Sequence, residues 1–130
     1  DKARYTMGVG LSPEDLFDVV EGGADMFDCV SPTRVARNGA LFNRQIGRSK
    51  KYRLEIGNKA YELDQRPVDE ECGCFTCKNY SRAYLNHLFK AQELSAYRLA
   101  TIHNLHHFLT YMREMREAIV EDRFESLRGA

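Results

Sequence analysis

The fold of this chain is decided by the stretch from Tyr5 to Val30, which reads YTMGVGLSPEDLFDVVEGGADMFDCV. Residues 5–10 are a short apolar run that ends in a glycine turn, and they predict a buried strand. Residues 12–15, SPED, have the residue types of a helix start, and the glycine pair at 22–23 ends that helix. Residues 24–30 predict a second strand. Strand, helix and strand in this order form a βαβ unit, which predicts a parallel sheet that needs further strands beside it.

The rest of the chain predicts a different organisation. Short antiparallel strands are expected at residues 41–42, 52–56 and 59–63, with a turn at Gly57-Asn58. From Ser81 onward, apolar residues recur at helical spacing, so we expect helices with a buried apolar face. Two stripes carry this face: Tyr84, Leu85, Leu88 and Phe89, and then Ile102, Leu105, Phe108, Leu109, Met112, Met115 and Ile119. The whole chain is therefore expected to be of the α/β class.

Length and composition exclude several kinds of protein. With 130 residues, 43% of them apolar and 29% charged, the chain is able to bury a core and is not pervasively disordered. It contains no apolar run of the roughly 18–20 residues that span a bilayer, so no membrane segment is expected. No signal-peptide core follows the first residues, and the first residue is Asp1 rather than methionine. We therefore expect the chain to be a fragment or a processed product.

The net charge of zero hides a strong pattern. Residues 11–30 carry six acids and no base, whereas residues 31–60 carry eight bases and one acid. Residues 61–72 return to five acids and one base. A stretch with net charge +7 between two acidic stretches is a candidate anion-binding strip, and a solvated surface loop is the alternative.

Three of the four cysteines lie within six residues, at Cys72, Cys74 and Cys77. The C-x-C-x-x-C spacing places three thiolates within reach of one metal ion, and a tetrahedral zinc site then needs a fourth ligand. His103 lies 26 residues beyond Cys77, and spacing alone does not choose between it and His87, His106 and His107. A redox pair, a disulfide framework and an iron–sulfur cluster are the alternatives.

Asp28 is a candidate catalytic carboxylate because it follows the second predicted strand at its carboxyl end. In parallel α/β barrels that end carries the catalytic groups. Asp25 lies three residues earlier and is expected on the opposite face of the strand. Residues 31–39 follow directly as a predicted loop with two arginines between Pro32 and Gly39. Arginines beside a carboxylate suit a polyanionic substrate, and an Asp–Arg salt bridge that ties the loop to the strand is the alternative.

Five motifs appear in a fixed order: YTMGVG at 5–10, DMFDCV at 25–30, PTRVARNG at 32–39, CGCFTC at 72–77 and TIHNL at 101–105. Together they resemble the C-terminal third of a bacterial-type tRNA-guanine transglycosylase, over residues 4–127. The resemblance implies a TIM (β/α)8 barrel with a zinc-binding subdomain and C-terminal helices. Residues 1–40 match the last βα units of the barrel, 41–70 short strands with a basic insertion, and 71–130 the zinc subdomain with the C-terminal helices.

The resemblance also implies an activity and a site. The family exchanges guanine at the tRNA wobble position for a 7-deazaguanine base, preQ1 or queuine, which leads to queuosine. Asp28 matches the nucleophile that attacks the ribose C1′ and forms a covalent intermediate. Cys72, Cys74, Cys77 and His103 match the ligands of one structural Zn2+ per chain. Met7 and Gly8 match residues beside the base pocket.

Contacts with tRNA are implied for two segments. They comprise Gly8, Val9, Gly10, Leu11, Ser12, Pro13, Glu14 and Asp15, and then Thr33, Arg34, Val35, Ala36 and Arg37. The implied partners are a tRNA with a GUN anticodon, the 7-deazaguanine base and a second copy of the chain bound through the zinc subdomain. The implied location is the cytoplasm, with no membrane partner.

The sequence departs from the family pattern in four places. The turn at residues 10–13 is one residue longer, Ser31 and Val35 replace a bulkier residue and an asparagine, and residues 43–62 are longer and more basic. The first two-thirds of the family's chain, with its general acid/base, is not matched. We therefore expect a partial enzyme that is inactive alone, and a zinc- and tRNA-binding module without catalysis is the alternative.

Overall fold

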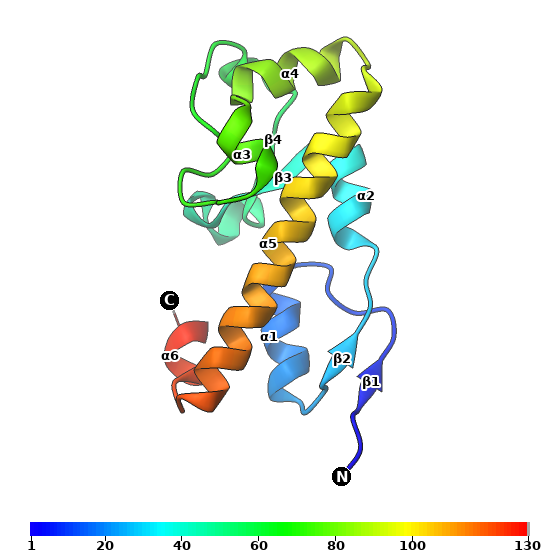
Figure 1. Ribbon diagram of the computed structural model, residues 1–130, viewed down its shortest axis with the longest axis vertical. Helices are drawn as coiled ribbons and strands as arrows, with labels where there is room; N and C mark the ends of the chain where they lie inside the picture. Colours follow the sequence, from blue (N-terminus) through cyan, green and yellow to red (C-terminus); the bar gives the residue numbers. More distant parts are fainter. Residues whose placement is uncertain (130) are drawn as a thin grey trace. The chain divides into compact units, whose positions relative to one another are not determined.

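The computed structural model describes residues 1–129, which form two compact units (Figure 1). Unit 1 contains residues 1–31 and the residues from 108 onward, and unit 2 contains Pro32–His107. The long helix α5, Leu94–Val120, contributes residues to both units. No helix in the described part of the chain combines the length and the apolar character that a membrane span requires.

Unit 1 begins with the predicted βαβ unit. β1 (Tyr5–Thr6), α1 (Pro13–Glu21) and β2 (Met26–Phe27) follow in order, and the two strands pair in parallel with Tyr5 opposite Met26. The sheet holds these two strands alone among residues 1–129. Each strand has only two residues, and both residues of β1 are exposed, so the prediction of a buried strand over 5–10 was wrong for this chain. A sheet of two such short strands buries little apolar surface.

The start of α1 forms as the sequence predicts. The Ser12 side chain accepts from the Asp15 N–H at 3.4 Å, and the Asp15 carboxylate accepts from the Ser12 N–H at 3.0 Å, which completes a capping box. Leu16 and Phe17 are buried, and the Phe17 ring packs edge-on against Tyr111 of α5. These contacts anchor α1 to the C-terminal part of α5. A short helix, α6 (Phe124–Arg128), ends the described chain.

Unit 2 combines a hairpin with helices and 3-10 turns. Its elements are α2 (Ser31–Arg37), β3 (Ala40–Phe42), η1 (Arg44–Ile46), η2 (Arg48–Lys50), β4 (Arg53–Glu55), η3 (Lys59–Tyr61), α3 (Phe75–Asn79), α4 (Arg82–Lys90) and the first part of α5. β3 and β4 pair in antiparallel register, as predicted, with Leu41 opposite Leu54.

Two local predictions in unit 2 were wrong. The loop predicted at residues 31–39 is largely the helix α2, and the strand predicted at 59–63 is replaced by η3. The Asn58 side chain accepts from the Ala60 N–H at 3.0 Å. This local hydrogen bond starts a helical turn and competes with strand pairing.

The buried face of α5 also differs from the predicted stripe. Leu105, Leu109 and Ile119 are 41%, 69% and 53% exposed, although Phe108 and Met115 are buried as predicted. The buried positions include small and polar residues: Ala96, Leu99, Ala100, His103, Asn104, His107 and Ala118. Alanines let the helix approach its neighbours closely, and the His103 and Asn104 side chains bind the backbone of β3. In unit 2 this face joins the main apolar core, with Ala36, Leu41, Leu54, Ile56, Val68, Leu85 and Leu88.

An arginine clamp fixes the segment that leads into the cysteine cluster. The buried Arg82 side chain donates to the carbonyls of Pro67 (2.8 Å) and Val68 (3.1 Å) and pairs with the Asp64 carboxylate at 3.1 Å. Asp64 also accepts two hydrogen bonds from the Arg66 guanidinium, at 3.0 and 2.9 Å. The hydrogen bonds of the Arg82 guanidinium and of the Asp64 carboxylate therefore hold residues 64–68 in place.

Candidate functional site

Three thiols and one imidazole converge in unit 2. The Sγ atoms of Cys72, Cys74 and Cys77 and a ring nitrogen of His103 all lie within 4.8 Å of one another. His103 Nδ1 is 3.7, 3.5 and 3.3 Å from the three Sγ atoms in that order. Ligands at ~2.3 Å (sulfur) and ~2.0 Å (nitrogen) around a tetrahedral ion stand roughly 3.6 Å apart. The four side chains therefore fit one tetrahedral metal ion.

Local structure places the three thiols on one side of a tight loop. Cys74 caps the N-terminus of α3, and its sulfur accepts from the Cys77 N–H at 3.3 Å. The Cys72 N–H donates to the Asp69 carbonyl at 3.2 Å, and the Asp69 carboxylate accepts from the Glu71 N–H at 2.9 Å. These short-range bonds curl the chain before α3 so that all three sulfurs face α5.

The structure selects His103 from the four histidines. His103 is fully buried on α5, and its Nε2 lies 2.7 Å from the Phe42 carbonyl oxygen. Because a carbonyl oxygen only accepts, Nε2 carries a hydrogen, and Nδ1 is the ring nitrogen that faces the thiols and could bind a metal ion. Such an outer partner is typical of histidine metal ligands. His107 instead stacks on the Phe42 ring at 5.4 Å, and His87 is exposed.

The electrostatics of the cluster favour thiolate. Hydrogen bonds with Cys72 and Cys77 lower the pKa of the Cys74 thiol. Hydrogen bonds with Cys72 and Cys74 raise the pKa of Cys77, which acts as a donor. Burial lowers the pKa of His103, but hydrogen bonds with Cys72 and Cys74 outweigh burial and raise it to about 9. Negative charge thus concentrates among the sulfurs. A bound cation stabilises this charge and deprotonates the remaining thiols.

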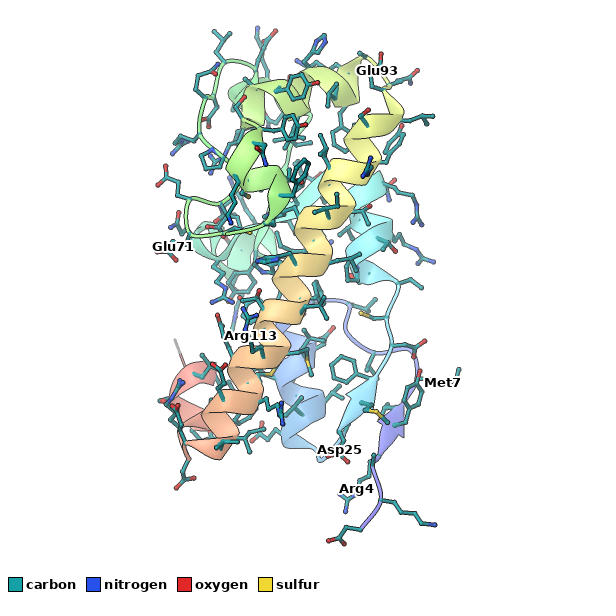
Figure 2. All side chains as sticks on the ribbon, viewed as in Figure 1. Arg4, Met7, Asp25, Glu71, Glu93 and Arg113 are labelled. Atoms are coloured by element: carbon teal, nitrogen blue, oxygen red, sulfur yellow. The ribbon has the colours of Figure 1, made fainter. Side chains whose placement is uncertain are left out.

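Asp28 lies just beyond the carboxyl end of β2, where the sequence predicts it. Its Oδ1 accepts from the Gly8 N–H at 3.3 Å, and the side chain is exposed. Gly8 has a φ of +70°, a left-handed conformation that suits glycine and turns its N–H toward β2. Met7 directly precedes Gly8, whose N–H binds Asp28, and the Met7 side chain is 77% exposed (Figure 2).

Tyr5 is a site residue that the sequence argument missed. It pairs with Met26 in the parallel sheet, so Asp28, two residues beyond Met26, lies diagonally across on the same face. A hydrogen bond with the Asp28 side chain raises the pKa of the Tyr5 hydroxyl, and the charge on Asp28 adds to this effect. The register of β1 against β2 is the signal that identifies Tyr5, because register fixes which side chains share a face of the sheet.

Asp25 does not share the surroundings of Asp28. Its carboxylate accepts from the Arg4 N–H at 2.7 Å and so binds the backbone before β1. The odd spacing of the two aspartates explains this difference, since successive strand residues point to opposite faces. Asp25 therefore has a structural contact and offers a matched control for Asp28.

The two segments matched to tRNA contacts have mixed surroundings. In residues 8–15, Leu11 is 72% exposed, Gly10 and Pro13 are buried, and Ser12 and Asp15 form the capping box. In α2, Arg34 and Arg37 are exposed, Thr33 and Val35 are half-buried, and Ala36 lies fully buried in the core. Exposed side chains in both segments are therefore available to a ligand.

Comparisons with known proteins agree with this arrangement. The family model for queuine tRNA-ribosyltransferase matches residues 1–130. Three similar curated proteins, each named queuine tRNA-ribosyltransferase, come from Dehalococcoides mccartyi strain 195 (54% identity), Desulforapulum autotrophicum (52%) and Thermoanaerobacter pseudethanolicus (55%). The matches cover 99%, 98% and 95% of this chain, and 31%, 33% and 31% of those proteins.

The chain thus spans about a third of the length of the curated relatives that it matches. The match includes the residues around Asp28 as well as the Cys3His cluster, because it extends over nearly the whole chain. These findings confirm the family resemblance drawn from the five motifs. The chain belongs to the queuine tRNA-ribosyltransferase family.

Proposed function

We propose that the protein containing this chain is a tRNA-guanine transglycosylase. It exchanges guanine at the wobble position of tRNAs with a GUN anticodon for preQ1 or queuine, in queuosine biosynthesis. The observation that carries this proposal is the exposed Asp28 carboxylate at the end of β2, bound to the Gly8 N–H, in a chain of this family. Because the chain spans about a third of its relatives, we infer that it is inactive by itself.

Asp28 acts as the nucleophile in this proposal. One carboxylate oxygen forms a bond to the ribose C1′ while the C1′–N9 bond to guanine breaks, and guanine leaves with the bonding electron pair. The incoming base then attacks C1′ and releases the carboxylate. Both steps pass through an oxocarbenium-like state, which a carboxylate stabilises as in retaining glycosidases. The Gly8 N–H and the Tyr5 hydroxyl orient the carboxylate for attack.

Recognition of tRNA is assigned to the exposed side chains of residues 8–15 and 33–37. Met7 and Gly8 lie beside the carboxylate and border the base pocket. Residues 8–15 and 33–37 contact the anticodon loop, where Arg34 and Arg37 stack on or hydrogen-bond to splayed bases. The target guanine leaves its stack to reach Asp28, which is easiest in a single-stranded loop.

The Cys3His cluster holds one Zn2+ in a structural role. Soft thiolates with one imidazole are the donor set that zinc prefers, and four protein ligands leave no open position for substrate. The ion therefore supplies stability to unit 2 and no chemistry. In the barrel that the family implies, residues 1–40 supply the last βα units, 41–70 the short strands, and 71–130 the zinc subdomain and C-terminal helices.

A second copy of the protein is the proposed protein partner, bound through the zinc subdomain. The Tyr80 and Tyr84 rings stack at 5.3 Å between centroids, and the Phe75 ring packs edge-on against Tyr80 at 5.9 Å. Phe75 and Tyr84 are 53% and 43% exposed. Partly exposed aromatic rings of this kind are typical of protein interfaces.

The test compares Asp28→Asn with Asp25→Asn in the full-length enzyme. Asp28→Asn is expected to abolish the covalent tRNA adduct on a denaturing gel, because an amide is a far weaker nucleophile than a carboxylate. Asp25→Asn is expected to keep the adduct. An adduct that persists in Asp28→Asn excludes Asp28 as nucleophile. If the unmodified enzyme binds tRNA but exchanges no labelled guanine, a zinc- and tRNA-binding module without catalysis is favoured instead.

A further inference from the structure

The connection between β3 and β4 forms a closed turn that carries several cations. We call residues 47–52 the basic turn. The Gly47 carbonyl accepts from the N–H groups of Lys50 (3.3 Å) and Tyr52 (3.0 Å), and the Arg48 carbonyl accepts from the Lys51 N–H at 2.9 Å. At its base, the Asn43 N–H donates to the Tyr52 carbonyl at 2.8 Å. Backbone hydrogen bonds therefore hold this segment in one compact shape.

Three cations, Arg48, Lys50 and Lys51, lie within four residues of the turn and are exposed. Lys51 and Tyr52 adopt left-handed φ values of 52° and 55°, which non-glycine residues seldom do. The tight reversal they produce brings the cations onto one small tip. Positive charges that repel one another are thereby held together, an arrangement that an anionic ligand stabilises.

The other bases of residues 31–60 lie outside the basic turn. The Arg53 guanidinium lies over the Phe42 ring at 5.4 Å, and the charge of Arg44 acts on the buried His107. Arg34 and Arg37 are on α2, which precedes β3, whereas the basic turn follows it. The three residues of β3 correspond to about 10 Å of strand. Apart from the exposed Lys59 on η3, the exposed bases of the strip therefore form two groups, one on α2 and one on the basic turn.

In the nearest acidic segment, Asp69 and Glu70 interact with groups outside the turn. The Asn43 amide donates to the Val68 carbonyl at 2.7 Å, which brings residues 69–71 close to the base of the turn. Asp69 is buried and its carboxylate accepts from a backbone N–H. The charge of Glu70 acts on Arg66 of the clamp.

We propose that the basic turn binds the phosphate backbone of tRNA at a place separate from the bases contacted by α2. Lysine and arginine side chains bind RNA phosphates without reading sequence, so the turn adds affinity and orientation rather than anticodon specificity. This inference rests on the proposed function, because it takes tRNA as the substrate. It assigns a role to the insertion that the anticodon contacts leave unexplained.

The experiment measures tRNA binding by the full-length enzyme from 0.1 to 1 M salt, without the incoming base. The variant is Lys50→Gln/Lys51→Gln, and the matched control is Lys90→Gln/Arg98→Gln, which removes two exposed charges from α4 and α5. Each lost phosphate contact lowers the slope of log Kd against log salt by roughly 0.7–0.9. We expect the slope to fall by about 1.5 and Kd at 0.1 M to rise about 30-fold, with little change near 1 M. The control and Lys50→Arg/Lys51→Arg are expected to keep the original slope.

Zinc content and the thermal unfolding midpoint establish that each variant is folded. An unchanged slope in the folded Lys50→Gln/Lys51→Gln variant overturns the inference, and so does an equal decrease in the control, which indicates a general charge effect. Either result leaves the proposed function intact if the unmodified enzyme still forms the Asp28 adduct. An unmodified enzyme that neither binds tRNA nor forms the adduct contradicts the proposed function itself.

Discussion

Asn104 is the residue whose replacement tests the packing of unit 2 most directly. It is fully buried on α5, next to His103 of the Cys3His cluster. Its Nδ2 donates to the carbonyls of Pro32 (3.0 Å) and Ala40 (2.9 Å), and its Oδ1 accepts from the Phe42 N–H at 3.1 Å. One amide thus joins α5 to the start of α2 and to both ends of β3, and it supports the same strand that binds His103.

Asn104→Ala leaves three buried backbone groups without this partner. Each such hydrogen bond contributes about 1 kcal/mol, and an unsatisfied buried group costs about 1–3 kcal/mol. We expect the free energy of opening unit 2 to fall by about 3–5 kcal/mol. At 1.4 kcal/mol per factor of ten, the open population then rises by at least about 100-fold. Asn104→Asp is expected to be similarly damaging, because its carboxylate faces two carbonyl oxygens.

The assay follows metal release from the full-length enzyme to a coloured chelator in excess. When opening and closing are faster than capture by the chelator, the release rate follows the open population, so it is expected to rise about 100-fold or more. Asn79→Ala is the matched control, because its exposed amide makes a single bond to the Phe75 carbonyl at 2.8 Å. A release rate within threefold of the unmodified enzyme in Asn104→Ala would refute this account of the α5–β3 contact.

Three further predictions concern single groups. We expect mass spectrometry to find one metal ion per chain in the unmodified enzyme and in His106→Ala, and none in His103→Ala. Equal metal content in the two variants excludes His103 as a ligand. The two arginines of the clamp hold the pKa of Asp64 far below its usual range, so its stabilising effect is complete above about pH 5 and declines as the pH falls below about 4. The difference in unfolding midpoint between the unmodified enzyme and Asp64→Asn should therefore shrink below pH 4, and a difference independent of pH contradicts this. Asp28→Asn removes the charge that raises the pKa of Tyr5, so NMR titration of labelled tyrosine should find that pKa shifted down toward 10, and no shift contradicts the hydrogen bond.

Much of the site was predictable because it depends on short-range spacing. The capping box at Ser12, the parallel βαβ unit and the antiparallel strands β3 and β4 formed as predicted. The three cysteines came together because their spacing fits one tight loop before α3. Such features depend on residues close in the sequence, whose geometry is fixed by local hydrogen bonds and side-chain type.

Register and helix orientation were not predictable in this way. The large apolar side chains of α5 predicted the buried face only in part, since hydrophobic size does not reveal that Asn104 and His103 bind β3 backbone groups. The side chain of Tyr5 looked like part of a buried strand, and only its pairing opposite Met26 placed it beside Asp28. Asn58 began a 3-10 turn in place of the expected strand.

By itself the sequence determined the family, the cysteine cluster and the position of Asp28 after a strand, because each is written in contiguous motifs. Spacing left four histidines open, and the family resemblance pointed to His103. The tertiary structure decided how His103 faces the thiols, which residues contact Asp28, and which cations of the basic strip gather on one turn. The physical reason is distance along the chain. Cys77 and His103 are 26 residues apart, and His103 and Phe42 are 61 apart. Contacts of that range depend on how helices and strands pack, and no local pattern specifies that packing.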